Sequence, residues 1–178
     1  TSLSFRKEGE NLLVDTPGEA PDPADTVVVL EIEGEPEVDN AVTIRPDESG
    51  VVRLNAADAE VHGASARYEH GGGRDNIGYW TDPSDWVSWD FVLDRRGSCT
   101  VEVIYACDKG CGGSEYVLAV GGRELAGRVE DTGSWTSFVT RILGKIRITK
   151  AGRQTLSVRP TRMPAYAVMN LKAVVLKP

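Results

Sequence analysis

Short apolar stretches with a two-residue period, separated by turn-forming residues, recur along the chain, and no stretch keeps the period of an amphipathic helix. Val87, Trp89, Phe91 and Leu93 alternate with other residues, as on a strand with one face in a core. Nineteen glycines and nine prolines supply the many turns that such a chain needs. The pattern predicts an all-β fold, an antiparallel sandwich or barrel.

The expected strands indicate one main domain after a short leading piece. Residues 1–50 contain strand-like runs only at 12–14, 27–32 and 41–45, the last within an acidic, turn-rich stretch. These runs are too few to form a core, so we expect the last strands of a preceding β-domain plus an acidic linker, or strands packed along the main domain's edge. Residues 51–178 form the main domain, with strands expected at 51–54, 59–62, 87–93, 99–106, 116–120, 123–125, 138–143, 145–148, 155–158 and 168–176.

The charge balance disfavours two classes of partner. The 178 residues include 27 acidic and 20 basic side chains, which gives a net charge of −7. Nucleic-acid binding depends on basic residues that neutralise phosphate, and anionic membranes repel acidic proteins. No apolar run approaches the roughly 20 residues of a spanning helix. Residues 1–7 lack the apolar core of a signal peptide, so we expect any export signal to lie upstream.

Three cysteines allow at most one disulfide. Cys107 and Cys111 flank a three-residue turn and are placed to close a small loop. Cys99 shares the parity of Val101, so we expect it in the core. A Cys107–Cys111 disulfide and free thiols both stay open, whereas a metal site is disfavoured because no histidine lies nearby.

Aromatic and amide residues beside turns point to a binding function. Tyr79, Trp80 and Trp135 each lie next to turn-forming residues, and loop aromatics are more often functional than those of strands. A flat aromatic face packs against the C–H face of a sugar ring, while an amide pairs with its hydroxyls. Asn170, which interrupts an apolar strand, supplies such an amide. We therefore predict a carbohydrate site formed by Tyr79, Trp80, Trp135 and Asn170.

Structural roles remain open for the same residues. Aromatics at these positions also suit the plugging of an open sandwich end, and Asn170 also suits a hydrogen bond to a neighbouring loop. Trp89 is expected in the core, and the pattern does not decide the role of Trp86. Asp58 and Glu60 share one face of a short strand, which suggests either a Ca²⁺ site or salt bridges.

Catalytic patterns are weak. His70 precedes three glycines, as in the oxyanion loop of some esterases, but the chain lacks the Gly-x-Ser-x-Gly elbow that this loop accompanies. With only His62 and His70, no catalytic triad has a persuasive candidate. Acidic residues are plentiful, but no pair is framed by aromatics as in a glycosidase cleft. We therefore expect no catalysis by this chain itself.

Taken together, residues 54–178 resemble the carbohydrate-binding modules of families 6 and 35. The resemblance runs through the segments 58–60, 76–80, 85–87, 101–106, 132–135 and 170–171. It implies a jelly-roll β-sandwich of the galactose-binding type. It also implies a sugar site in the loops at one end, formed by Tyr79 or Trp80 with Trp135 and Asn170.

The chain departs from this resemblance at Lys172. The family commonly places an acidic residue there, which completes a structural Ca²⁺ site with carboxylates like those of Asp58 and Glu60. A lysine repels a cation at that position. We therefore expect a salt bridge from Lys172 to Asp58 or Glu60 in place of the metal, and no cofactor.

The leading piece has a resemblance of its own. Residues 5–31 resemble the last strands of the C-terminal β-domain of bacterial family 29 α-L-fucosidases. This implies a secreted glycoside hydrolase, extracellular or periplasmic, whose catalytic residues lie upstream of Thr1. The chain would then be its non-catalytic, glycan-targeting C-terminal region. Two alternatives stay open: a structural sandwich that packs on the catalytic domain without binding sugar, and a small enzyme in its own right.

Overall fold

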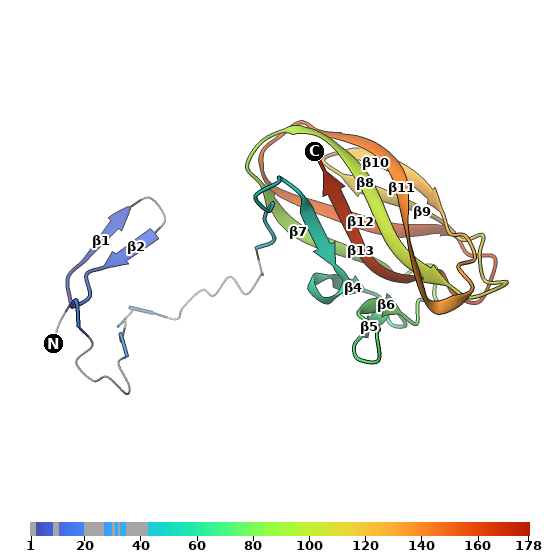
Figure 1. The fold of residues 1–178 in the computed structure, drawn as a ribbon, viewed down its shortest axis with the longest axis horizontal. Coiled ribbons are helices and arrows are strands. Elements are labelled where there is room, and N and C mark those ends of the chain that lie inside the picture. The colour runs from blue at the N-terminus through green and yellow to red at the C-terminus, as the bar shows by residue number, and fades with distance from the viewer. Residues whose placement is uncertain (1–2, 9–10, 20–26, 30, 32, 35–42) are drawn as a thin grey trace. The chain divides into compact units, whose positions relative to one another are not determined.

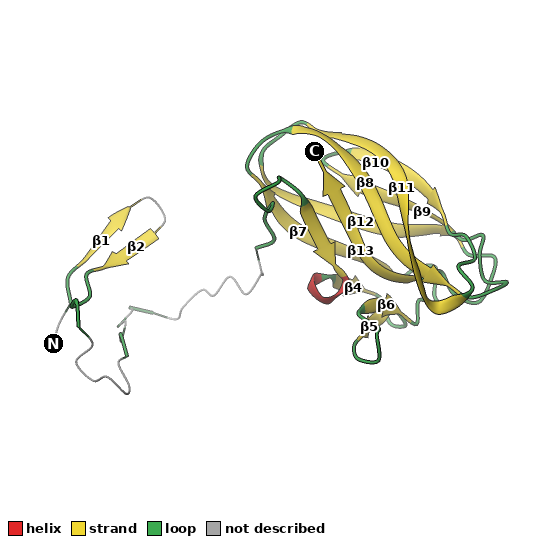
Figure 2. Cartoon of the chain, viewed as in Figure 1, coloured by secondary structure: helices red, strands yellow, loops and turns green. Residues whose placement is uncertain are grey.

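A computed structural model describes residues 3–8, 11–19, 27–29, 31, 33–34 and 43–178. The chain divides into two compact units, 1–39 and 40–178. Figure 1 traces the strands of both units, and Figure 2 shows that strands dominate the second. Among the described residues, no helix combines the length and the apolar character that crossing a membrane requires.

The first unit contains a single hairpin in its described part. β1 (Phe5–Glu8) pairs antiparallel with β2 (Asn11–Val14). The open end of the hairpin is closed by Asp15, whose carboxylate accepts a hydrogen bond from Arg6 Nη1 at 3.1 Å. A lone two-stranded hairpin is marginally stable in water, so this piece contributes no core of its own.

Two strands expected before residue 50 differ from the structure. Residues 27–29 are exposed and irregular rather than part of a strand, while residues 30 and 32 lie outside the described residues. β-branched residues favour strands only where a partner strand is present. Ile44 bridges Phe91 in parallel and accepts a hydrogen bond from the backbone of Val92 at 2.9 Å. The described residues before 51 therefore join the sandwich from residue 43 on.

The second unit consists of two facing antiparallel sheets, and this confirms the expected all-β jelly-roll sandwich. The first sheet has the order β10-β9-β12-β7-β4. The second has the order β11-β8-β13-β6-β5, and β3 also pairs with β13. The strands of the first sheet are β4 (Glu60–His62), β7 (Trp86–Leu93), β9 (Glu115–Val120), β10 (Arg123–Arg128) and β12 (Gly152–Arg162). The others are β3 (Val52–Asn55), β5 (Arg67–Glu69), β6 (Asn76–Gly78), β8 (Gly97–Cys107), β11 (Ser134–Ile148) and β13 (Asn170–Lys177), with one 3-10 turn, η1 (Ala56–Asp58).

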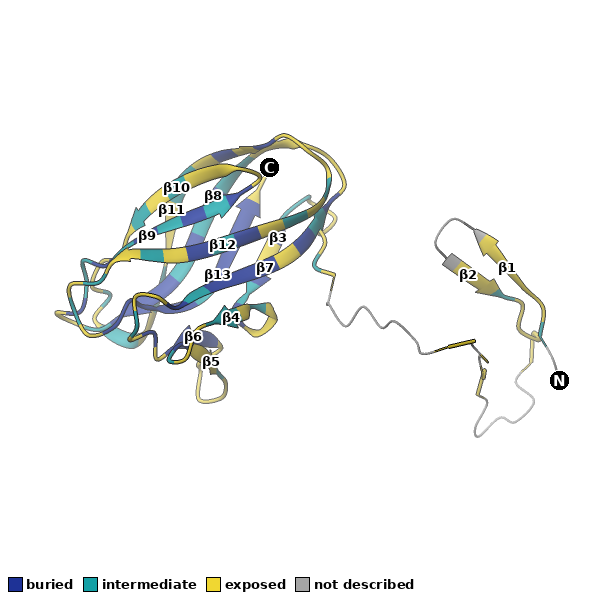
Figure 3. Ribbon diagram, turned by 180° about the vertical axis from the view of Figure 1, so that it is seen from behind, coloured by how far each residue is buried: buried dark blue, intermediate teal, exposed yellow. Residues whose placement is uncertain are grey.

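The core lies between the sheets and follows the alternation seen in the sequence. Val87, Trp89, Phe91 and Leu93 are all buried on β7, as predicted. The indole of Trp89 also donates a hydrogen bond to the Asn55 carbonyl at 2.7 Å, which satisfies its polar atom inside the core. Figure 3 shows the alternation of buried and more exposed residues along β12.

A buried carboxylate fixes the loop between β4 and β5. Asp85 is 1% exposed, and its oxygens accept backbone hydrogen bonds from Ala64, Ser65 and Ala66 at 3.1, 2.9 and 2.7 Å. A Cβ on Gly63 would overlap this carboxylate, so the close approach requires glycine. Three backbone donors offset the cost of burying the charge and hold the loop against the sandwich.

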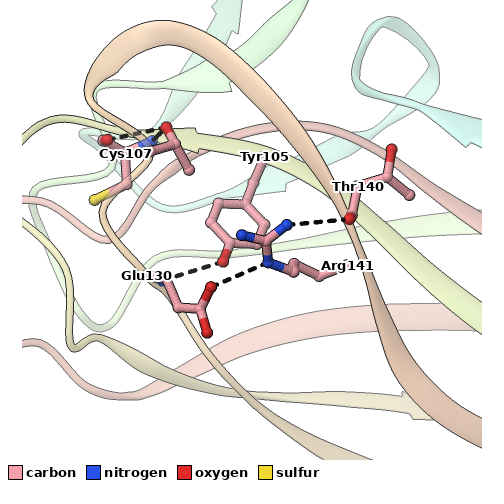
Figure 4. A network of polar contacts seen from close by, with 6 residues as sticks. Tyr105, Cys107, Glu130, Thr140 and Arg141 are labelled. Atoms are coloured by element: carbon pink, nitrogen blue, oxygen red, sulfur yellow. Dashed lines mark hydrogen bonds and ion pairs between the residues drawn. The ribbon is translucent and has the colours of Figure 1, made fainter.

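Of the two possibilities that the sequence left open for Cys107 and Cys111, the structure has free thiols, and Cys99 is free as well. Cys107 ends β8, where its backbone N–H donates to Thr132 Oγ1 at 2.9 Å and its carbonyl accepts from the same hydroxyl at 3.0 Å (Figure 4). Burial raises the pKa of the Cys107 thiol to about 12. Cys111 is buried as well, at 6% exposed. Cys99 packs against the core, as predicted.

A polar cluster beside Cys107 anchors the chain before β11. Tyr105 Oη accepts a hydrogen bond from the backbone N–H of Glu130 at 3.1 Å. The Glu130 carboxylate accepts another from Arg141 Nε at 3.0 Å, and Figure 4 shows these contacts side by side. Residue 130 is thus held through both its backbone and its side chain, which fixes the chain that leads into β11.

The sandwich unit begins and ends at the same end of the fold. Residues 47–50 form a turn in which the backbone N–H of Gly50 donates to the Asp47 carbonyl at 2.8 Å. A Cβ placed on Gly50 would lie 3.3 Å from Cγ of Pro178. The start of β3 and the end of β13 therefore touch.

Candidate functional site

A cavity of about 260 Å³ lies where β11 and β13 begin, and we call it the slot. It brings together all four residues that the sequence predicted for sugar binding: Tyr79, Trp80, Trp135 and Asn170. It is lined by Glu69, Arg74, Tyr79, Trp80, Thr81, Trp135, Thr136, Tyr166, Ala167, Met169 and Asn170.

Trp135 and Tyr166 form the aromatic wall of the slot. Trp135 is half-buried on β11, and its Nε1 donates a hydrogen bond to Tyr166 Oη at 3.2 Å. The two rings meet edge to face, with centroids 6.0 Å apart and an interplanar angle of 69°. Tyr166 is 62% exposed and comes from the loop before β13. Each ring fixes the orientation of the other and keeps apolar surface open to the slot.

Asn170, the first residue of β13, is hydrogen-bonded to this wall. Its Nδ2 donates a hydrogen bond to the Trp135 carbonyl at 2.9 Å, and the side chain is 8% exposed. The structural bond that the sequence left open is therefore present, and the same side chain still lines the slot. Within the described residues its amide oxygen has no hydrogen-bond donor, which leaves an acceptor for a ligand hydroxyl.

Trp80 is buried, which fits the plugging role that the sequence left open for it. It is 0% exposed, and its Nε1 donates to the Asp85 carbonyl at 3.0 Å. Its own carbonyl accepts from the Val168 backbone at 2.8 Å, which ties it to the Tyr166 loop. Trp80 therefore supports the floor of the slot and offers no free face for stacking.

Tyr79 is turned outward by its backbone. It has a φ of 51°, in the left-handed region that is uncommon for residues other than glycine. Its side chain is 51% exposed, and the Arg67 guanidinium lies 3.6 Å from the ring centroid. One ring face is thus covered by a cation, and the other is the one available to a ligand.

Tyr166, Glu69 and Arg74 are among the slot residues that the sequence did not predict. Tyr166 follows Pro164 by two residues, and it therefore lies beside a turn former, as Trp135 does beside Gly133. Arg74 Nη1 lies 3.0 Å from Glu69 Oε1, across the glycine-rich loop between β5 and β6. Charged residues around a flexible loop give no sequence signal that they will pair in a cavity.

Trp86, whose role the sequence left open, is covered on the outer face of the first sheet. It stacks on His62, with centroids 3.6 Å apart and planes inclined by 13°. The Arg159 guanidinium lies 3.3 Å from the Trp86 centroid. His62 is on β4 and Arg159 on β12, the strands on either side of β7. Trp86 therefore has a neighbour on each ring face.

The residues suggested for calcium do not converge on a site. Asp58 accepts from Asn55 Nδ2 at 3.4 Å, and Glu60 lies 3.8 Å from His62 Nε2. The described part of the chain contains no group of three or more acidic, histidine or cysteine side chains suited to a metal. These donors do not fit a structural Ca²⁺ ion.

The expected salt bridge from Lys172 to Asp58 or Glu60 is also wrong. Lys172 Nζ lies 4.7 Å from the ring centroid of Phe138 instead. The register between β13 and β8 shifts between Leu171 and Ala173, so Lys172 sits at an irregularity in the strand. A bulge re-aims the side chain at its position, which strand parity alone does not foresee.

Comparisons with known proteins give matches in structure only. No family model matches the chain, and no curated protein matches it. A family 35 carbohydrate-binding module from Clostridium thermocellum superimposes with a TM-score of 0.59 and 16% identity, over 71% of this chain and 96% of that one. The C-terminal family 6 module of the laminarinase LamC from Zobellia galactanivorans gives 0.58 and 15%, over 72% and 99%.

A third match shows that this fold is not confined to carbohydrate-binding modules. The insecticidal crystal protein Cry2Aa superimposes with a TM-score of 0.60 and 12% identity, over 75% of this chain and 22% of that one. At such identities the likeness shows a shared sandwich fold, and folds of this kind serve more than one function. The function must therefore be argued from the slot.

Proposed function

We propose that this protein is a non-catalytic carbohydrate-binding module whose ligand occupies the slot. The observation that carries the proposal is the meeting of Trp135, Tyr166, Tyr79 and Asn170 in one open cavity. The rings supply apolar surface for the C–H face of a sugar, and the Asn170 oxygen accepts from a hydroxyl. The shared fold with family 35 and family 6 modules supports the proposal.

The acidic residues of the slot argue against catalysis. Hydrolysis of a glycoside commonly needs two carboxyl groups that flank the scissile bond. Glu69 is the one acidic residue lining the slot, and both its oxygens already accept, from Arg74 and Asn76. The slot therefore suits binding better than bond cleavage.

The finer proposal concerns the parent protein. The resemblance of residues 5–31 to a family 29 α-L-fucosidase supports a place behind such an enzyme, outside the cell or in the periplasm. In that setting the module would hold the enzyme on a glycan and raise its local concentration. The net charge of −7 supports neutral glycans rather than nucleic acid or anionic membranes as partners.

Calorimetric titration of the chain with fucose, galactose, xylose and uronic-acid oligosaccharides tests the proposal. We expect saturable binding to at least one of them, with a Kd in the micromolar to millimolar range, about −8 to −4 kcal/mol. Trp135→Ala should weaken it about tenfold to a hundredfold, because a stacked ring and its buried apolar area are lost. Trp86→Ala is the matched control, since that half-buried tryptophan lies outside the slot.

Three outcomes would overturn this proposal. If no sugar gives heat, the alternative of a structural sandwich that packs on a catalytic domain replaces it. If Trp86→Ala weakens binding as much as Trp135→Ala, the ligand does not occupy the slot. Hydrolysis of an aryl glycoside by the isolated chain, lost in Glu69→Gln, would instead favour an enzyme.

A further inference from the structure

Two charged residues line the slot, and they are paired with each other. Glu69 Oε1 and Arg74 Nη1 lie 3.0 Å apart, and every other residue lining the slot is uncharged. Arg67, on the same strand as Glu69, is stacked on Tyr79 and does not line the slot. The charged edge of the slot is therefore electrically neutral as a unit, opposite an aromatic wall.

The Glu69 carboxylate is held in place from three sides. Its side chain is 13% exposed, and its second oxygen accepts from Asn76 Nδ2 at 3.1 Å. Asn76 is itself fully buried on β6. A Cβ on Gly78 would overlap Oε2 of Glu69, so the carboxylate rests directly on the glycine backbone. The negative charge is thus fixed beside the slot and cannot swing away.

Arg74 is the more accessible partner of the pair. Its side chain is 52% exposed, and it ends the glycine loop, where its backbone N–H donates to the Gly71 carbonyl at 3.0 Å. The loop is closed by the backbone N–H of Asp75, which donates to the Glu69 carbonyl at 3.1 Å. Arg74 therefore keeps free N–H donors at the mouth of the slot, while one edge of its guanidinium is used by Glu69.

We propose that the Glu69–Arg74 pair makes the slot selective for uncharged sugars over uronic acids. An unpaired arginine would bind a sugar carboxylate through two parallel hydrogen bonds. With Glu69 fixed beside it, an incoming carboxylate would share the site with a like charge. Neutral hydroxyls meet no such penalty, because one can donate to Glu69 while a neighbour accepts from Arg74.

This inference rests on the proposed function, and matched ligands separate the two. Methyl glycosides of galactose, glucose and mannose are titrated, each against the methyl glycoside of the corresponding uronic acid. In every pair of which a member binds, we expect the neutral sugar to bind about tenfold more tightly than its acid. Raising the salt concentration should bring the two affinities closer together, because screening weakens the repulsion between the Glu69 carboxylate and that of the uronic acid.

Glu69→Gln is the decisive variant. It keeps the shape of the side chain and releases the charge of Arg74, so the preference should vanish or turn toward the uronic acid. Glu130→Gln is the control, because it removes a carboxylate paired with an arginine at the same 3.0 Å outside the slot. Circular dichroism confirms folding, and Arg74→Gln gives a second variant, which should still reject the acids.

Each result decides between the two proposals. A wild-type protein that binds a uronic acid as tightly as its neutral partner overturns the selectivity inference alone. A folded Glu69→Gln protein that keeps the wild-type ratio of neutral to uronic-acid affinity also overturns the selectivity inference. If no probe of either kind binds, the proposed function fails, and the inference fails with it.

Discussion

Trp86 and Trp135 are both half-buried, yet their surroundings differ completely. Trp86 lies between an imidazole and a guanidinium, each within 4 Å of its ring centroid at 3.6 and 3.3 Å. Trp135 has one ring neighbour, Tyr166, which meets it edge to face beside an open cavity. The fraction of a side chain that is exposed therefore does not decide whether an aromatic is available to a ligand. What decides it is which neighbours cover its faces.

The largest expected effect comes from Trp80, a third tryptophan, which is fully buried. Trp80→Ala should lower the free energy of unfolding by about 3–5 kcal/mol, because it removes a fully buried indole and leaves a cavity. Urea denaturation measures the change. Trp86→Ala should cost clearly less at its half-buried position. Equal losses of unfolding free energy in Trp80→Ala and Trp86→Ala would contradict the difference in burial between the two tryptophans.

The next effect tests the hydrogen bond between Trp135 and Tyr166, the two residues of the aromatic wall. Tyr166→Phe removes the hydroxyl that accepts from Trp135 Nε1 and keeps the ring. We expect binding of the best sugar to weaken up to about tenfold, since a hydrogen bond contributes about 0.5–1.5 kcal/mol net. Stability should hardly change at this exposed position. Tyr68→Phe, which loses a hydrogen bond to Asp75 outside the slot, should leave the Kd unchanged.

A smaller effect tests the covered tryptophan. Arg159→Gln uncovers one face of Trp86 and should lower the free energy of unfolding by about 0.5–1 kcal/mol, the value of a cation–π contact at an exposed site. Sugar binding should be unaffected. The unfolding free energy and the sugar affinity are compared with those of Arg123→Gln, which changes an exposed arginine on β10. A loss of sugar binding in Arg159→Gln alone would place the ligand on the sheet face.

The smallest effect concerns the carboxylate of Asp131 and the loop that it holds. Backbone hydrogen bonds from Gly110 at 2.9 Å and Gly112 at 2.6 Å hold the pKa of Asp131 below its ordinary value of 3.8. A lowered pKa in the folded state stabilises the protein above the ordinary value, and that contribution is lost as the pH falls through the folded-state pKa. Asp131→Asn should therefore destabilise the protein at neutral pH.

A pH series of denaturation curves checks this expectation. The stability difference between wild type and Asp131→Asn should stay constant above about pH 5 and shrink below about pH 4. Within the described residues, the Asp131 carboxylate is hydrogen-bonded to neither Trp135 nor Tyr166, so sugar affinity, measured on the same samples, should not change. Parallel stability profiles down to the lowest pH would show that the Asp131 charge does not stabilise the loop.

The sequence was sufficient for the fold because strand periodicity is a local property. The alternation from Val87 to Leu93 placed the core face of β7 correctly. The strands expected at 27–32 and 41–45 lie partly outside the described residues, and their described residues show no strand beyond the bridge of Ile44 to Phe91. Strand propensity has meaning only when a neighbouring strand is present.

The slot was predicted less completely, and two local backbone features explain why. Tyr79 and Trp80 are adjacent and looked equivalent, but the positive φ of Tyr79 turns one ring outward while its neighbour lies in the core. Lys172 sits at an irregularity of β13 and reaches Phe138 rather than a carboxylate. Tyr166 and Glu69 enter the slot from loops and strand ends that only the tertiary fold brings together.

Gly50 and Pro178 lie close together at the end of the sandwich opposite the slot. Asn170 begins β13 at the slot, and Pro178 follows the end of the same strand, about 25 Å away at 3.3 Å per residue. Any polypeptide joined after residue 178 is thus attached at the end of the sandwich that lies away from the slot. A further domain joined there would leave the mouth of the slot unobstructed.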